Sequence, residues 1–575
     1  MPKSNLRIDI LGTSLSIAAE EDSAYLESLL NHYRIKIENN RKKFGLSDPL
    51  KLAIVTGFLL CDEAQKAQHG GTGALADSES SDLDEAERLT LDLITRIDEV
   101  LENGSKTSIF LKAGTLKHLF KLENPVKHYD WGSPRWIPQL LGRENAGGEP
   151  WAELWMGVHP EGPSWAVLDA AETGISGTDV PEDAKVPLEE LIRQNPEFYL
   201  GEQIQKEFGG LPFLYKLLAA GKPLSVQAHP DLEQAKAGWE RENNSGISLK
   251  APNRNYKDAN HKPEILCALS PFRAMCGFRE PGEIKRLLDI FSGVQSGGIA
   301  FGGAPRSAGA AGTGTPVTET LAAGFARLRT ALEGDNGLQD FLTALFALDE
   351  ETRFDLGEYT AARGPELEQL YPGYADEWRT AAYFAGLYPG DPAVIASLYL
   401  NLLRLAPGEA VYLPAGVLHA YIDGFGVELM ANSDNVLRGG LTSKHVDIEE
   451  LTRILKFVPF RPEILRPVEL VPTQRVPETG EENTGREPIW SYPTDCREFS
   501  LGVTQSRGED IPFPAGGPEI LLVTQGKARL SWRESGEEVT LEPGESAFAA
   551  QREQAGDLVC SGSFTIFTAS VGSLS

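Results

Sequence analysis

The first hundred residues pass from a strand-like pattern to a helical one. Residues 6–18 (LRIDILGTSLSIA) alternate apolar and polar positions around Gly12 and Thr13, which predicts a β-hairpin. Apolar residues then recur at intervals of three and four, which predicts helices over 22–44, 48–68 and 83–102. Residues 69–82 (HGGTGALADSESSD) have the composition of a flexible linker. The spacing in the last helix favours a short coiled-coil or bundle seam.

From about residue 116 the pattern changes to short β-type runs separated by glycine and proline. Helical periodicity takes over after residue 280 and is interrupted by a low-complexity loop at 296–316. Strand-like runs then return and continue to the C-terminus. We therefore expect a front module over 1–105 and a catalytic β domain in two parts, 116–280 and 401–455. A helical insert over 281–400 would lie between those parts, and a second β domain would occupy 456–575.

An internal repeat links the two β regions that follow the insert. LAPGEA (405–410) is echoed by LEPGES (541–546), and each lies between β-type runs with Pro-Gly supplying a turn. The run EILLVTQGKARLSW before the second copy predicts two strands joined at Gly526. Small antiparallel barrels built in this way occur as cupins, a jelly-roll variant. Ala555 stands at the repeat position of His419, so we expect the second barrel to be structural and free of metal.

Composition narrows the class of protein. The 575 residues carry a formal charge of −29, which argues against nucleic acid and anionic membranes as partners. The five cysteines are widely spaced and form no CxxC pair, which favours a reducing, cytoplasmic compartment. The chain has no long apolar run and no signal-like N-terminus. We expect a multidomain α+β protein of the cytoplasm.

The stretch KPLSVQAHPD (222–231) holds the most informative chemistry. Its alternation places Gln227 and His229 on one face of a strand. With Glu264 and His419, they offer two imidazoles, a carboxylate and an amide oxygen, a set that suits zinc and leaves room for water or substrate. From the residues alone, a histidine near a strand end is more often a surface or core hydrogen-bonding group than a metal ligand.

Six blocks in the chain resemble type I mannose-6-phosphate isomerases (phosphomannose isomerases), in the order found in that family. They are KHYDWGS (127–133), PWAELWMGVHPEGPS (150–164), LPFLYKLLAAGKPLSVQAHPD (211–231), NHKPEILCAL (260–269), YLPAGVLHAY (412–421) and GVELMANSDNVLRGGLTSKHVD (426–447). The resemblance implies two cupin-like jelly-roll domains with a helical insert. It also implies one zinc ion per chain, bound by Gln227, His229, Glu264 and His419.

The same resemblance implies interconversion of mannose 6-phosphate and fructose 6-phosphate through a cis-enediol. Such a proton transfer needs a base, a proton donor and a group that stabilises the developing oxyanion. Arg438 suits the enediolate, and the base remains open among His261, Lys262, Glu428 and Asp434. Lys216, Ser225 and Lys444 are the phosphate candidates. Trp131 would form a wall of the sugar site or pack in the core, and Tyr421 would contact substrate or a ligand's neighbour.

The front module resembles ZapA-type cell-division proteins through ILGTSL and the segment SDPLKLAIVTGFLLCDEAQKA (47–67). That family combines a small ββα domain with a coiled-coil helix, and the resemblance implies self-association and binding to filaments of FtsZ. The linker at 69–82 interrupts the expected coiled coil. Two alternatives to an active isomerase remain: a sugar-phosphate-sensing scaffold without turnover, and a metal-dependent oxygenase, whose histidine-rich sites fit Gln227 poorly.

Overall fold

The computed structural model describes residues 4–10, 13–19, 36–37, 116–168, 184–293, 317–470 and 489–573. The chain divides into two compact units, Met1–Ile109 and Phe110–Ser575. Among the described residues, no helix is both long and apolar enough to cross a membrane.

The front unit begins with the predicted hairpin. Strands β1 (Ser4–Ile10) and β2 (Thr13–Ala19) pair antiparallel, with Ile10 opposite Thr13. Of the helix predicted over 22–44, only residues 36–37 are described, and they are helical. The remainder of that helix, the linker and the two further helices lie outside the described residues.

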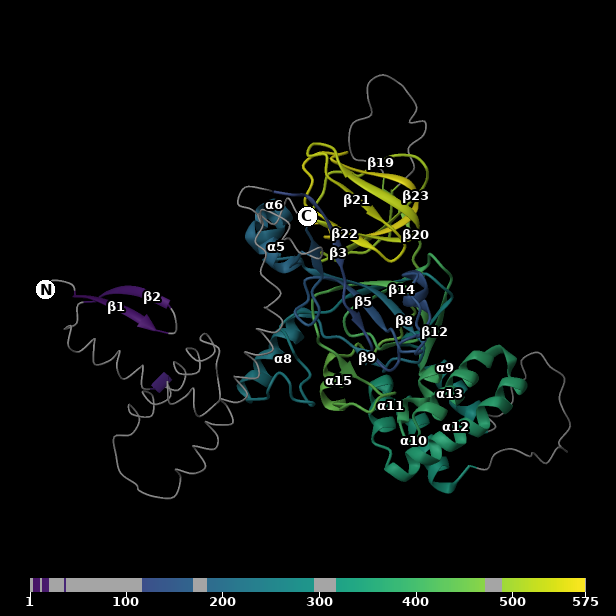
Figure 1. Ribbon diagram of the computed structural model, residues 1–575. Helices are drawn as coiled ribbons and strands as arrows, with labels where there is room; N and C mark the ends of the chain where they lie inside the picture. The colour runs from purple at the N-terminus through teal and green to yellow at the C-terminus, as the bar shows by residue number, and fades with distance from the viewer. Residues whose placement is uncertain are drawn as a thin grey trace, which may run out of the picture. The chain divides into compact units, whose positions relative to one another are not determined.

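A ten-stranded sheet forms the centre of the second unit (Figure 1). Its main path runs β12-β11-β14-β8-β5-β4, with β9, β10, β13 and β15 joined at the side. The strands are β4 (Val126–Lys127), β5 (Glu153–Gly157), β8 (Phe213–Ala220), β9 (Gln227–Ala228), β10 (Glu264–Ala268), β11 (Phe272–Phe278), β12 (Leu400–Leu405), β13 (Ala410–Leu413), β14 (His419–Ala431) and β15 (Leu437–Arg438). This sheet carries every predicted metal ligand on or beside a strand.

An eleven-stranded sheet contains the C-terminal strands and three strands from much earlier in the chain. Its members are β3 (Leu119–Glu123), β6 (Trp165–Val167), β7 (Lys185–Pro187), β16 (Val468–Glu469), β17 (Ile489–Ser491), β18 (Ser500–Arg507), β19 (Ile511–Pro512), β20 (Glu519–Trp532), β21 (Glu538–Leu541), β22 (Ser546–Ala549) and β23 (Leu558–Ser570). β3 pairs with β22 and so covers a strand edge that would otherwise be open. The C-terminal domain therefore takes strands from the range 116–280, which sequence alone assigns to the catalytic domain.

The two predicted turns of the internal repeat adopt one geometry. LAPGEA joins β12 to β13, and LEPGES joins β21 to β22. Gly408 and Gly544 occupy the left-handed region at φ +87° and +85°, where an L side chain is strained. In each turn the glutamate amide donates to the carbonyl three residues earlier at 2.9 Å. The repeat seen in the sequence is thus a repeat in backbone conformation.

The prediction of two strands joined at Gly526 is wrong. β20 is one strand of 14 residues that pairs with β23 on both sides of Gly526. The register shifts between Val523 and Gln525, and Gly526 has φ +74°. A Cβ atom there would lie 2.0 Å from the carbonyl oxygen of Ser563. Glycine therefore marks a bulge that bends a continuous strand.

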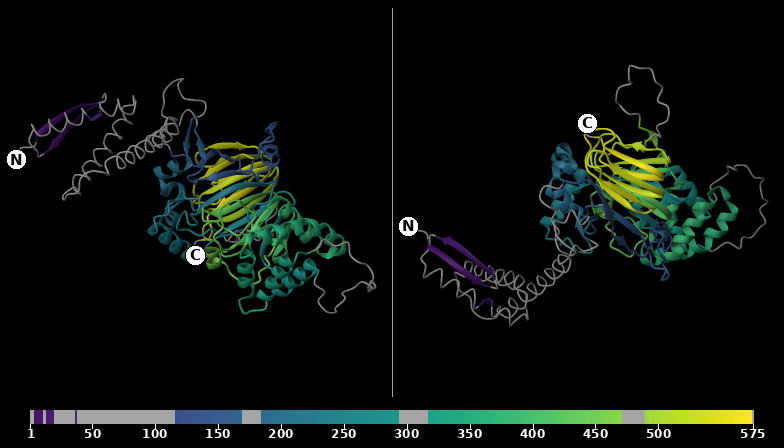
Figure 2. Two further views of the ribbon diagram at one scale, coloured as in Figure 1. Left: turned by 90° about the horizontal axis from the view of Figure 1, so that it is seen from below. Right: turned by 45° about the horizontal axis from the view of Figure 1, so that its top comes forward.

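The helical insert agrees with the periodicity over 281–400. Its α-helices are α9 (Pro281–Ser292), α10 (Glu319–Ala331), α11 (Gly337–Phe346), α12 (Glu350–Leu370), α13 (Ala375–Leu387) and α14 (Ala396–Tyr399). The low-complexity loop predicted within the insert lies outside the described residues. Shorter helices elsewhere in the unit are α4 (Trp136–Leu140), α5 (Leu188–Gln194), α6 (Pro196–Leu200), α7 (Glu202–Phe208), α8 (Leu232–Asn244) and α15 (Ile448–Ile454). Figure 2 shows the insert gathered beside the ten-stranded sheet, away from the C-terminal strands.

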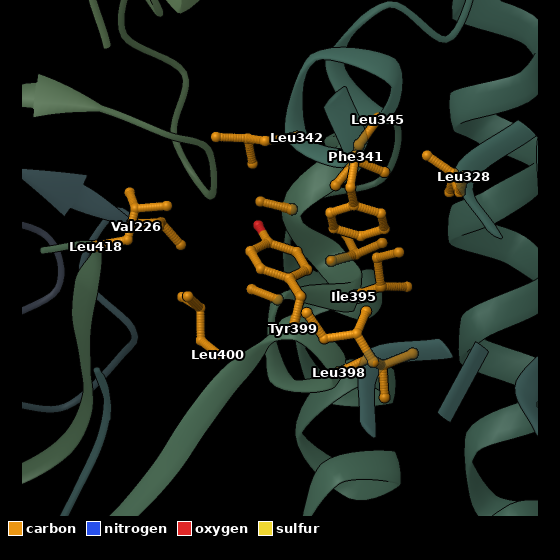
Figure 3. Close-up of a cluster of buried hydrophobic side chains, with 14 of the residues drawn as sticks. Val226, Leu328, Phe341, Leu342, Leu345, Ile395, Leu398, Tyr399, Leu400 and Leu418 are labelled. Carbon is orange, nitrogen blue, oxygen red and sulfur yellow. The ribbon is translucent and has the colours of Figure 1, made fainter. Parts of the chain in front are cut away.

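The insert packs against the back of the strands that carry the site. Val226 and Leu418 each precede a predicted metal ligand, and both are buried in one apolar cluster with Phe341 and Tyr399. Figure 3 shows these side chains facing one another between the strands and the helices. Burial of such residues stabilises by roughly 2 kcal/mol each. The packing thereby fixes the strands whose opposite faces carry the ligands.

Candidate metal centre

Three neighbouring strands bring the predicted ligands together. Gln227 on β9 pairs with His419 on β14 and with Arg438 on β15, and directly opposed residues project from the same face. Glu264 begins β10, which pairs with β13 and β14. Regular strand in KPLSVQAHPD is limited to Gln227–Ala228. The alternation nevertheless holds, because Val226 and Ala228 are fully buried in the apolar core behind the site.

The ligand atoms of His229, Glu264 and His419 all lie within 4.8 Å of one another. The Nε2 atoms of both histidines are 3.5 Å from Glu264 Oε2. The amide nitrogen of Gln227 is 3.4 Å from His419 Nε2, and a half-turn of the amide places its oxygen there. All four predicted ligands therefore converge on one point.

Backbone carbonyls set the tautomers of both imidazoles. His229 Nδ1 donates to the carbonyl of Asn435 at 2.7 Å, and His419 Nδ1 donates to that of Val417 at 3.0 Å. The Nε2 lone pairs then point toward Glu264. Burial lowers the pKa of His229 to about 4, which favours the neutral, metal-binding form. Such outer contacts are typical of histidine ligands.

Two buried polar atoms at this point have no hydrogen-bond partner among the described residues. Neither His229 Nε2 nor Glu264 Oε2 makes a hydrogen bond, and an unpaired buried polar atom costs about 1–3 kcal/mol. A divalent cation would satisfy both atoms. Two imidazoles and one carboxylate with an amide oxygen fit zinc better than calcium or magnesium.

Lys262 borders the cluster. Its Nζ lies 3.1 Å from Glu264 Oε1. Burial raises the pKa of Glu264, but the Lys262 ammonium and His229 outweigh that effect and hold it well below the usual range. The ligand carboxylate is therefore ionised at neutral pH, and a cation stands beside it.

The described residues show no hydrogen-bond or ion-pair partner for the Arg438 guanidinium, which shares its face with Gln227. Burial lowers the pKa of Arg438 from its ordinary value. Burial, Arg438 and Lys257 together lower the pKa of Lys444. Ser225 is half-buried two residues before Gln227. Arg438 therefore places a positive charge beside Gln227, and Lys444 is close enough to Arg438 for the two charges to interact.

Lys216 is placed differently from the other phosphate candidates. It is buried between two carboxylates, with Nζ 3.4 Å from Glu153 Oε1 and 3.2 Å from Glu428 Oε2. Tyr421 donates to the other oxygen of Glu428 at 2.8 Å. Burial raises the pKa of Glu428, while Lys216 opposes the rise. The lysine charge is therefore already balanced within the protein.

His261 and Trp131 make contacts away from the cluster. His261 Nε2 lies 2.7 Å from Glu498 Oε1, on the segment between β17 and β18. Trp131 is half-buried, stacks on Tyr129 with ring centroids 5.7 Å apart and packs against the apolar residues of the ten-stranded sheet. The structure thus joins His261 to the C-terminal domain and gives Trp131 a packing role.

Asp434 is one-third exposed, at 34% of its side chain, and one of its oxygens lies 3.4 Å from His159 Nε2. His159 lies within one of the family blocks, but sequence reasoning does not single it out. Glu153, the partner of Lys216, is missed for the same reason. The position of His159, two residues after the wholly buried strand β5, could have indicated a buried histidine. A buried histidine needs a polar partner, so this position predicts a nearby polar contact.

Comparison with known proteins places this site in a family. The sequence model of the phosphomannose isomerase type I catalytic domain matches residues 119–281. Mannose-6-phosphate isomerase of Escherichia coli is 36% identical over 433 residues, which cover 75% of this chain and 95% of that protein. The chain belongs to the type I phosphomannose isomerase family. Mannose-6-phosphate isomerase 1 of Arabidopsis thaliana is 32% identical, over 74% of this chain and 88% of that protein.

Solved structures of phosphomannose isomerases share the fold. A variant of the Salmonella typhimurium enzyme superposes with a TM-score of 0.64 at 30% identity, covering 79% of this chain and 100% of that one. A zinc-bound mannose 6-phosphate isomerase gives a TM-score of 0.63 at 30% identity, over 80% and 100% of the two chains. The predicted enzyme class is confirmed.

The front of the chain matches a second family. The sequence model of cell division protein ZapA matches residues 6–102, which confirms the resemblance stated for that segment. The match includes the hairpin of β1 and β2. The chain therefore joins a segment that is similar to ZapA to a part that is similar to phosphomannose isomerases.

Proposed function

We propose that this protein interconverts mannose 6-phosphate and fructose 6-phosphate at the cluster of Gln227, His229, Glu264 and His419, with one zinc ion per chain. The convergence of these four side chains, with buried Nε2 and Oε2 atoms left unpaired, carries the proposal. When bound, zinc would supply a Lewis acid that polarises oxygens of the open-chain sugar.

The protein's own residues then handle the proton and the charge. The C2 proton of the open-chain aldose passes to a carboxylate, which leaves a cis-enediolate with its charge on O1. A proton then passes from O2 to O1, and return of the carbon-bound proton from the carboxylic acid to C1 gives the ketose, with the carbonyl now at C2. Asp434 is the better base, since it is partly exposed and one oxygen is open. Glu428, by contrast, is held by Lys216 and Tyr421. Arg438 donates to the enediolate, and Lys262 supplies a proton donor beside Glu264.

Ser225 and Lys444 remain our candidates for the substrate phosphate. Among the described residues, no side chain forms a hydrogen bond or ion pair with Ser225 Oγ or Lys444 Nζ, whereas the charge of Lys216 is balanced by Glu153 and Glu428. Lys216 then acts on the site by holding Glu428. We further propose that both β domains are cupin-like jelly rolls, which their repeated turn geometry supports. A cytoplasmic location stays a prediction from the cysteine pattern.

Metal content and turnover of purified protein test the assignment. We expect about one zinc per chain by elemental analysis, and interconversion of the two sugar phosphates that a chelator abolishes and added zinc restores. Reaction in deuterated water should place deuterium at C2 of mannose 6-phosphate or C1 of fructose 6-phosphate, where exchange accompanies proton transfer. Fully loaded protein without turnover would contradict the enzyme and favour the sugar-phosphate sensor.

We also propose that the ZapA-like module mediates self-association and contact with FtsZ filaments. The match over residues 6–102 supports this proposal, and the separate compactness of Phe110–Ser575 makes the module removable. Deletion of residues 1–105 should leave kcat/KM nearly unchanged and lower the mass measured by light scattering. An unchanged mass contradicts self-association, and failure of the full chain to co-sediment with FtsZ polymers contradicts the contact.

A further inference from the structure

His159 is fixed in one orientation and one tautomer by the turn that follows β5. The residue is 4% exposed. The backbone N–H of Glu161 donates to His159 Nδ1 at 3.3 Å, so the neutral ring carries its proton on Nε2. The edge of the ring meets Trp155 at a centroid distance of 4.8 Å. A Cβ on Gly162 would lie 2.9 Å from Lys127 Nζ and 3.2 Å from Trp155, so the turn lies tightly against the sheet.

His159 Nε2 lies 3.4 Å from one carboxylate oxygen of Asp434. Asp258 holds the backbone around Asp434: its carboxylate accepts from the Asp434 amide at 2.7 Å and from Ser433 Oγ at 2.8 Å. The backbone carbonyl of the next residue, Asn435, accepts a hydrogen bond from His229 Nδ1. The backbone of this segment is therefore held to His229, a predicted metal ligand. The carboxylate of Asp434 lies beside His159.

The surroundings of Asp434 favour its ionised form. Burial raises the pKa of Asp434, but His159, Lys262 and Lys257 outweigh it and lower the pKa below the ordinary value. Tyr129 and Asp258 also face this group. Within the described ranges, no second side chain donates to the carboxylate, whose side chain is one-third exposed.

We infer that His159 is a positioning residue for the isomerisation, because its Nε2–H holds the Asp434 carboxylate in the orientation that accepts the sugar proton. This inference rests on the proposed function and adds a residue to it. His159 touches neither the sugar nor the metal cluster in this arrangement. It acts through Asp434.

Two conservative variants separate this role from a structural one. The amide of asparagine replaces Nδ1 and keeps the turn, whereas the longer glutamine places an N–H near the position of Nε2. His159→Asn should lower kcat by about 10–100-fold, with KM and zinc content nearly unchanged. His159→Gln should recover most of that loss. His118→Gln is the control, since His118 pairs with Glu537 in the C-terminal domain.

The pH profile gives a readout that a loss of folding would not mimic. Removal of the donor raises the pKa of Asp434, and a base must be ionised to act. The acid limb of kcat should therefore move to higher pH by about one unit in His159→Asn. An unmoved limb with unchanged kcat overturns the inference, and so does activity lost only in proportion to folded, zinc-loaded protein. In an Asp434→Asn background, His159→Asn should cause no further loss.

A measurement without turnover separates this inference from the proposed function. The carboxyl pKa of Asp434 is readable by ¹³C NMR of aspartate-labelled full-length protein, with Asp434→Asn assigning the signal. His159→Asn should raise that pKa, and an unchanged value contradicts the inference even in an active enzyme. Zinc-loaded wild-type protein that lacks turnover defeats the proposed function, whatever the NMR result.

Discussion

The two β domains place a glutamate at the same position and give it different partners. Glu264 opposes Leu413 on β13, and Glu519 opposes Ala549 on β22; each opposing residue lies eight positions after the first residue of the repeated turn motif. Both glutamates are buried. In the first domain the carboxylate faces His229 and His419. In the second it lies 2.8 Å from Arg552 Nη2.

The difference shows two ways to balance a buried carboxylate. The first domain offers imidazole lone pairs, so an added cation completes the charge balance. The second supplies its own guanidinium, whose side chain is wholly buried and whose Nε donates to the carbonyl of Pro514. The same framework position thus holds a candidate metal ligand in one domain and one half of an ion pair in the other.

Substitution of the two glutamates should separate these roles most strongly. Glu264→Gln removes a ligand and should lower kcat/KM by roughly 10³-fold, together with zinc content. Glu519→Gln should leave both unchanged. Elemental analysis and steady-state kinetics on matched preparations check the pair, and loss of zinc in Glu519→Gln would contradict the comparison.

Loss of Arg552 should affect stability without affecting the metal. Arg552→Met leaves the Glu519 carboxylate buried and unpaired, which should destabilise by about 3 kcal/mol. Replacing both residues with apolar side chains of similar volume should recover much of that loss. Denaturant unfolding of the zinc-loaded protein measures both effects. A double variant no more stable than Arg552→Met argues against charge as the cause.

The contact between His261 and Glu498, which joins the two β domains, should make the stability of the protein depend on pH. Burial raises the pKa of Glu498, but hydrogen bonds from His261 and Cys496 outweigh it and lower the value to about 2. A depressed pKa contributes stability above the unfolded value, and this contribution is lost as the pH falls toward about 2. Glu498→Gln should therefore destabilise by about 1.5 kcal/mol at pH 7 and by less at pH 3. Thermal unfolding across this range checks the trend, and an equal difference at both pH values contradicts it.

The smallest expected effect concerns the repeated turns. Gly408→Ala places a side chain at φ +87° with open space around it, which should cost about 1 kcal/mol. Gly544→Ala adds a contact of 2.5 Å with Leu141 Cδ2, so it should cost slightly more. Calorimetry of the two variants checks the order. A smaller cost at Gly544 would show that Leu141 moves away freely.

Much of the metal site could be predicted because it depends on local periodicity. Alternation along KPLSVQAHPD predicts that Gln227 and His229 lie on the opposite face from Val226 and Ala228. In the structure, Val226 and Ala228 are buried in the apolar core, and His229 lies in the candidate metal cluster. The Pro-Gly turns were equally readable, since their conformation is set by their own residues. The bulge at Gly526 was not, because the same glycine also fits a turn and only pairing with β23 distinguishes the two.

The sequence by itself determined which residues are candidates for the site, because local backbone preferences and side-chain periodicity select the strands, the turns and the face that holds Gln227 and His229. Only the tertiary structure decided which side chains meet. Lys216 lies against Glu428, His261 against Glu498, and His159 against Asp434, each pair more than two hundred residues apart in the chain. Such contacts follow from how strands pair and domains pack, because the geometry of a single segment does not specify its distant partner.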